Sequence, residues 1–131
     1  FLMTHQTEQA PLKQAGLAHL FSAASYSAGG LTRLAKEAAF RQEVVAGAGL
    51  LAAYAIMDVT AAIRLSAAVL FLLLIAMEAV NTAIEEIIDR ISPEVSDTGK
   101  HAKDLGSLAV SCLILANSLL LLSALSVHLS M

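Results

Sequence analysis

Four polar side chains share one face of a single apolar helix near the middle of the sequence. They are Glu78, Asn81, Glu85 and Asp89, in the stretch EAVNTAIEEIID. At about 100° per residue, Glu85 and Asp89 fall within about 20° of Glu78, with the isoleucines on the opposite face. A carboxylate in hydrocarbon costs several kcal/mol, so this stripe must face a protein interior or a wet cleft, which indicates a functional site. Interhelical hydrogen bonding would explain one such residue better than four.

The chemistry that this stripe suggests is phosphoryl transfer at a membrane surface. Neighbouring polar segments supply Glu37, Lys103 and Asp104. Carboxylates without cysteine or paired histidine favour a hard divalent cation, and Mg²⁺ usually arrives with phosphates and few protein ligands. Lys103 is the compact cation expected to touch those phosphates. Glu78 lies deepest, where a lipid hydroxyl would be, and is the expected base. Because no GxxxxGK[ST] motif is present, phosphoryl transfer is at this point one interpretation among several.

The elements that must carry these residues are membrane helices. The chain has 131 residues, enough for one domain, and its 57% hydrophobic and 15% charged residues make it more apolar than a soluble domain. The fold class predicted is all-α, with N-terminal amphipathic surface helices plus three transmembrane helices in a single membrane domain, 1–131. The expected parts are a flexible N-terminus at 1–10, interfacial helices at about 11–43 broken at Gly29-Gly30, transmembrane helices at about 44–58, 62–90 and 105–128, and a polar segment at 94–104.

The distribution of basic residues predicts the orientation. Three spans place the N-terminal helices and the Arg90–Asp104 segment on one side of the membrane. Seven of the eight Lys and Arg residues fall on that side, and only Arg64 falls on the other. By the positive-inside rule the first side, with the N-terminus, is cytoplasmic. The basic residues form no groove-like cluster, so nucleic acid is not an expected partner.

Three motifs make the chain resemble the small prokaryotic diacylglycerol kinases, a family that also includes undecaprenol kinases. They are EAAFRQE (Glu37–Glu43), ExxNTAIExxxDR (Glu78–Arg90) and AKDxGSxAV (Ala102–Val110), and the similarity extends from about Tyr26 onward. The resemblance implies a multi-pass enzyme of the bacterial inner membrane, assembled as a helical-bundle homotrimer. It implies transfer of the γ-phosphate of MgATP to the hydroxyl of diacylglycerol, giving phosphatidic acid, with Mg²⁺ as cofactor and ATP as co-substrate.

The resemblance also implies roles for individual residues. By this resemblance Glu78 corresponds to the general base of the family, which also contacts the lipid. Asn81 corresponds to a residue that positions the acceptor or the base. Glu37 and Glu85 are similar to the ligands of magnesium and nucleotide. Further nucleotide contacts are implied at Tyr26, Glu94, Lys103 and Asp104, and lipid-side or packing roles at Gln42, Arg64 and Ser107.

The chain departs from the family pattern at a few positions. Gly29 stands in YSAGG where many members have a lysine, and Val95 and Ser96 follow Glu94 where an aromatic and a histidine are common. These changes bear on nucleotide contacts of the N-terminus and the loop. The EAAFRQE form and the DRIS ending favour diacylglycerol over undecaprenol as the acceptor.

Alternatives remain at this point. Glu37 and Arg41 have the spacing of a helix-surface ion pair. Asp89 either holds metal or positions a neighbouring Lys or Arg. A non-enzymatic trimeric membrane protein that conducts protons or ions through Glu78 and Glu85 is the alternative from another class. Such a relay needs no nucleotide site, so the Lys103-Asp104 pair, together with Glu37 near the stripe, is the feature that favours the kinase.

Overall fold

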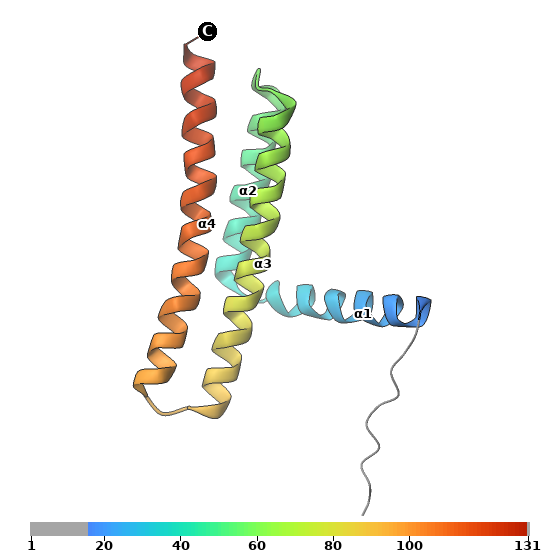
Figure 1. The fold of residues 1–131 in the computed structure, drawn as a ribbon, viewed down its shortest axis with the longest axis vertical. Helices are drawn as coiled ribbons and strands as arrows, with labels where there is room; N and C mark the ends of the chain where they lie inside the picture. The colour runs from blue at the N-terminus through green and yellow to red at the C-terminus, as the bar shows by residue number, and fades with distance from the viewer. Residues whose placement is uncertain (1–15, 131) are drawn as a thin grey trace, which may run out of the picture.

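The computed structural model describes residues 16–130, which form four helices: α1 (Leu17–Leu34), α2 (Ala38–Ile56), α3 (Ala61–Ile91) and α4 (Asp97–Leu129). Figure 1 shows α2, α3 and α4 side by side along the long axis, with α1 projecting away from them at a steep angle. The all-α class is therefore confirmed. The predicted flexible segment 1–10 and the start of the predicted helix at residue 11 lie outside the described residues.

Helices α3 and α4 form a hairpin, and a side-chain cap fixes where each of the two helices begins. Thr60 begins α3 because its hydroxyl accepts a hydrogen bond from Ile63 N at 3.3 Å. The helix ends at Ile91, before Ser92-Pro93, since a residue preceding proline avoids the helical region. Ser96 begins α4 by accepting from Gly99 N at 3.1 Å. The polar segment expected at 94–104 is therefore helical from Asp97 onward, and only a short turn joins the two helices.

The expected break at Gly29-Gly30 is wrong. Helix α1 runs through both glycines and ends at Leu34, and the turn of the chain comes at 35–37. Glycine lowers helix stability by only about 1 kcal/mol relative to alanine, so a helix of good surrounding residues tolerates it. The turn is fixed instead by Arg41, whose Nη1 donates to the carbonyl oxygens of Ala35 and Lys36 at 3.0 and 2.8 Å.

Two of the described helices, α3 and α4, are long and apolar enough to cross a membrane. Their outward faces carry large exposed apolar side chains, and the buried core is small, centred on Tyr54, Val59, Ala67 and Ala124. This is the pattern of a membrane protein, since lipid can cover faces that water cannot. Helix α2 has 19 residues, or about 28 Å, and carries Arg41 and Glu43 in its first turns. A third span at α2 remains a prediction.

A close approach of α2 to α3 depends on Gly47. A Cβ atom at this position would lie 2.0 Å from Phe71 Cε2, inside the ring's van der Waals surface. We expect Gly47→Ala to destabilise the protein by about 1–3 kcal/mol, because the ring or the helix has to move. Unfolding of detergent-solubilised protein by denaturant would measure the change.

The matched control is Gly49→Ala, two residues along the same helix. A Cβ there meets nothing within 4 Å, so the substitution is expected to leave stability unchanged or to raise it through helix propensity. Equal effects of the two substitutions would contradict the packing argument.

Candidate active site

Glu78 is the acidic side chain that the helices bury most deeply among the described residues. It is 6% exposed, and its neighbour on the next turn, Thr82, is 7% exposed. The carboxylates of Glu85 and Glu37 act electrostatically on Glu78, and Glu78 acts in turn on Glu43. Glu78 therefore interacts electrostatically with three other carboxylates, from α3 and the start of α2. Such a concentration of negative charge suits a cation or a proton-accepting site better than a structural role.

Asn81 occupies the contact between α3 and α4. Its Nδ2 donates to Glu85 Oε1 at 3.3 Å, while its Oδ1 is buried without a hydrogen-bond partner among the described residues. A Cβ on Gly106 of α4 would lie 2.2 Å from that oxygen. The glycine therefore leaves room for Asn81, and Asn81 orients Glu85. The oxygen is closed off at this contact, so the part of Asn81 that acts on the site is its Nδ2.

Glu37 stands at the corner between α1 and α2. It is the N-cap residue of α2, but its side chain does not cap the helix and instead accepts from Arg33 Nη1 at 2.7 Å. The Nε of Arg33 donates to Glu86 Oε1 on α3. Hydrogen bonds to the two carboxylates raise the pKa of the Arg33 guanidinium above its usual range. The alternative that Glu37 pairs with Arg41 is wrong, since Arg41 binds backbone carbonyls.

The predicted nucleotide contacts of the α3–α4 turn lie together. Lys103, Asp104 and Glu94 all line a cavity of about 280 Å³ at the end of the hairpin. Lys103 Nζ lies 2.6 Å from Asp89 Oδ1, so Asp89 positions this cation, as one of the two alternatives for it foresaw. Lys100 pairs in the same way with Asp104 at 2.6 Å. Lys103 also acts electrostatically on Glu85, which links this cavity to the carboxylates.

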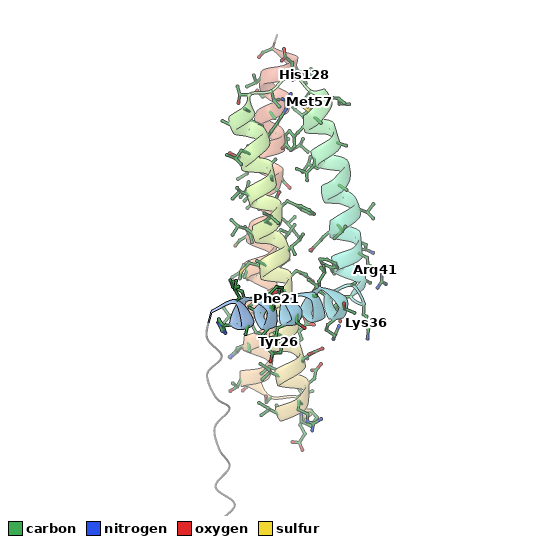
Figure 2. The ribbon with its side chains drawn as sticks, turned by 90° about the vertical axis from the view of Figure 1, so that its right-hand side faces the viewer. Phe21, Tyr26, Lys36, Arg41, Met57 and His128 are labelled. Carbon is green, nitrogen blue, oxygen red and sulfur yellow. The ribbon has the colours of Figure 1, made fainter. Side chains whose placement is uncertain are left out.

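Tyr26 lies apart from that cavity, on α1, with its side chain 80% exposed. Figure 2 shows Tyr26 on the side of α1 opposite Phe21, which faces the end of the bundle where Met57 and His128 lie. Among the described residues, Tyr26 is not one of those that line the cavity of Lys103. Its predicted contact with nucleotide remains a prediction.

An apolar groove of about 390 Å³ runs between α2, α3 and α4. Gln42 and Glu43 line it at the end near the carboxylates, and Leu50 lines it about 16 Å from Ala39 along α2. Asn117 is the polar residue deeper in the groove, where its Nδ2 donates to Leu113 O at 2.8 Å and to Leu70 O at 3.4 Å. Gln42 therefore lines the apolar groove, and its lipid-side role remains a prediction.

Two other residues with predicted lipid-side or packing roles lie outside this groove. Arg64 is at the opposite end of the bundle, where it donates to the carbonyl oxygens of Tyr54 and Met57, each at 3.2 Å. It therefore closes the α2–α3 turn, which is the packing role. Ser107 is exposed on α4, and its carbonyl accepts from Ser111 Oγ at 2.9 Å.

The sequence reasoning gave no role to three features of this site. Glu43 has a buried Oε2 without a partner among the described residues, beside the groove. Gly106 makes the room for Asn81, and Arg33 bridges Glu37 and Glu86. Glu43 and Gly106 belong to the quoted motifs, so their place in the motif was the signal available. Nothing in the sequence pointed to Arg33, because its partner lies 53 positions away.

The carboxylates of this site suit a magnesium ion that is already bound to a nucleotide. Within residues 16–130, no group of three or more His, Cys, Asp or Glu side chains is arranged to hold a metal ion. Glu37 and Glu85 offer two carboxylates, and Mg²⁺ commonly binds through one or two of these when substrate phosphates and water complete its octahedron. The residues present therefore fit a magnesium ion that arrives with a nucleotide, and not one caged by protein alone.

Comparison with known proteins bears directly on this site. A family model described as "Prokaryotic diacylglycerol kinase" matches residues 25–125. A diacylglycerol kinase from Sinorhizobium sp is 58% identical over 105 residues, covering 80% of this chain and 77% of that protein. Those of Pseudomonas aeruginosa and Escherichia coli K12 are 39% and 38% identical, over 73% and 72% of this chain and 79% of each relative. The chain therefore belongs to the prokaryotic diacylglycerol kinase family and is a kinase.

Proposed function

We propose that the chain transfers the γ-phosphate of MgATP to the hydroxyl group of diacylglycerol, giving phosphatidic acid, with Glu78 as general base. The observation that carries this proposal is the position of Glu78. Along α3, the buried Glu78 lies between Leu74, which lines the apolar groove, and Asp89, which lines the polar cavity with Lys103. A lipid alcohol from the groove and a nucleotide from the cavity would meet beside Glu78.

Each residue of the site has a role in the proposed transfer of phosphate. The lipid hydroxyl oxygen attacks the γ-phosphorus, the bond from that phosphorus to the bridging oxygen of ADP breaks, and the hydroxyl proton passes to Glu78. Lys103, held by Asp89, stabilises charge on the phosphates. Bound Mg²⁺, held by Glu37 and Glu85, would supply further charge neutralisation on the β- and γ-phosphates. Asn81 orients Glu85 through its Nδ2, and we assign it the positioning of the acceptor or the base.

The kinase assignment removes the non-enzymatic alternative, so the choice left is the acceptor. The groove is lined by generic apolar side chains such as Leu50, Leu74 and Ile114, which suit the acyl chain of a glycerolipid and an isoprenoid chain alike. We favour diacylglycerol because the three relatives described above are all named diacylglycerol kinase. Undecaprenol is the second candidate.

The proposal includes an arrangement in the bacterial inner membrane. The basic residues Arg33, Lys36, Arg41 and Lys103 lie toward the end of the bundle that holds the site, which supports a cytoplasmic site and N-terminus. Phe21 and Tyr26 point to opposite sides of α1, as for a helix on the membrane surface. Three copies forming a homotrimer would cover apolar faces of α3 and α4 and close the site, and α2 would be the third span of each.

The experiment that tests this function is MgATP-dependent transfer of labelled phosphate into lipid by the purified protein in detergent. Diacylglycerol, undecaprenol and a lipid without a free hydroxyl are supplied in turn. The proposal expects transfer to diacylglycerol with the highest kcat/KM. Preferred transfer to undecaprenol would move the acceptor assignment to the second candidate, and transfer to neither would overturn the proposed reaction.

The groove makes a separate prediction through Ala46, which lines it on α2. Ala46→Leu adds three carbon atoms to the space that an acyl chain would fill. We expect the KM for lipid to rise by roughly tenfold, since a few methylenes in a hydrophobic pocket are worth about 1–3 kcal/mol. The KM for MgATP should stay unchanged. Steady-state kinetics with lipid and nucleotide varied separately measure both values.

Ala48→Leu is the matched control, because Ala48 is exposed on the same helix and does not line the groove. It should leave both KM values near those of the wild type. A rise in the KM for lipid in this variant alone would contradict the assignment of the groove to the acceptor.

A further inference from the structure

The guanidinium of Arg33 joins three parts of the fold. Arg33 belongs to the last turn of α1. Its Nη1 donates to Glu37 Oε1 at the N-cap of α2, at 2.7 Å, and its Nε donates to Glu86 Oε1 on α3. One planar fork therefore holds two carboxylates from different elements, an arrangement that lysine with its single ammonium cannot reproduce.

The link through Arg33 is important because few other contacts hold α1 against the bundle. Helix α1 projects away from the bundle and meets α3 over a short stretch, so little apolar packing fixes its angle. Glu37 lies at the corner that follows α1. Its side chain does not cap α2 and instead accepts a hydrogen bond from Arg33. The orientation of Glu37 toward Glu78 thus depends on where Arg33 is held, and Glu86 holds it.

We propose that Arg33 is a positioning residue, which ties α1 to Glu86 and thereby holds Glu37 in the geometry that binds MgATP. The inference rests on the proposed role of Glu37 at the nucleotide. The side chains of Arg33, Glu37 and Glu86 are 40%, 36% and 52% exposed. Ion pairs as exposed as these add little to stability, so the consequence falls on the geometry of the site and not on folding.

The test is Arg33→Gln, measured by steady-state kinetics. The KM for MgATP is expected to rise roughly tenfold, the lower end of what outer partners of metal ligands contribute. The KM for lipid should not change, and kcat should change much less than the KM for MgATP. Lys36→Gln is the matched control, since Lys36 is exposed at the same corner and its side chain makes no hydrogen bond or ion pair among the described residues.

Glu86→Gln cuts only the tie to α3 and should raise the KM for MgATP in the same direction by a smaller factor. The double variant Arg33→Gln/Glu86→Gln should be no worse than Arg33→Gln alone, because both remove one linkage. An unchanged KM for MgATP in Arg33→Gln would overturn the inference. So would a fall in that KM, which would mean that Arg33 competes with the metal for Glu37.

A binding measurement separates this inference from the proposed reaction. Binding of Mn²⁺·ATP to the detergent-solubilised protein, followed by electron paramagnetic resonance, needs no lipid turnover. Weaker binding in Arg33→Gln than in Lys36→Gln supports the positioning role even where the wild type fails to phosphorylate the lipid supplied. Equal binding in the two variants, with an active wild type, overturns the positioning role and leaves the proposed reaction intact.

Discussion

Replacing Glu78 with glutamine should reduce kcat for phosphate transfer to lipid by about 10²–10⁴-fold, the range over which a positioned general base contributes. The amide keeps the size of the side chain and removes its ability to take the hydroxyl proton. Because Glu37, Glu85 and Lys103 are untouched, the KM for MgATP should stay close to that of the wild type. Label transfer into diacylglycerol and a separate nucleotide-binding measurement give the two quantities.

The folded state of this variant should be intact. Glu78 is 6% exposed and forms no hydrogen bond or ion pair with another described residue, so the wild type carries the cost of burying this carboxylate. Glu78→Gln is therefore expected to unfold at the same temperature as the wild type or higher. Asp58→Asn, the same chemical change at an exposed site near Met57, is the control and should leave kcat unchanged. Wild-type turnover in Glu78→Gln would remove Glu78 from the base role.

The sequence predicts the helices well where hydrophobic periodicity is long and uninterrupted. The helix expected at 62–90 coincides with α3, Ala61–Ile91, because the Thr60 cap marks its start and Pro93 keeps Ser92 out of the helical region at its end. The prediction was wrong at Gly29-Gly30 and in the polar segment before Leu105. In both places local composition favours a break, and the helix nevertheless forms: about 1 kcal/mol per glycine does not interrupt α1, and the Ser96 cap starts α4 within the polar segment.

The site was predictable in its composition and not in its contacts. The stripe from Glu78 to Asp89 follows from helical spacing alone, and the motifs bring Glu37 and Lys103 to it. The pairing of Lys103 with Asp89, of Arg33 with Glu86 and of Asn81 with Gly106 depends on how helices pack across the chain. Spacing along one helix fixes which side chains share a face, and it carries no information about which face of another helix meets them.

Replacing Glu85 with glutamine should give the opposite kinetic pattern to the change at Glu78. Loss of a carboxylate that holds nucleotide-borne Mg²⁺ removes several kcal/mol of charge stabilisation. We therefore expect the KM for MgATP to rise by at least about a hundredfold at fixed free Mg²⁺, since each 1.4 kcal/mol is a factor of about ten. The measurement is initial rate against free Mg²⁺ and MgATP, with lipid held constant.

The comparison of the two glutamine variants is the informative one, because both remove one negative charge from the same helix face. If only the total negative charge of the stripe were important, Glu78→Gln and Glu85→Gln would change kcat and KM in the same way. If the two residues have different chemical roles, excess Mg²⁺ should partly restore the rate of Glu85→Gln and leave Glu78→Gln inactive.

Glu85→Asp keeps the charge on a shorter side chain, so its KM for MgATP should fall between those of the wild type and Glu85→Gln. Asn81→Ala should raise the KM for MgATP in the same direction, since its Nδ2 orients the Glu85 carboxylate. If excess Mg²⁺ rescued Glu78→Gln and not Glu85→Gln, the roles of these two residues would have to be exchanged.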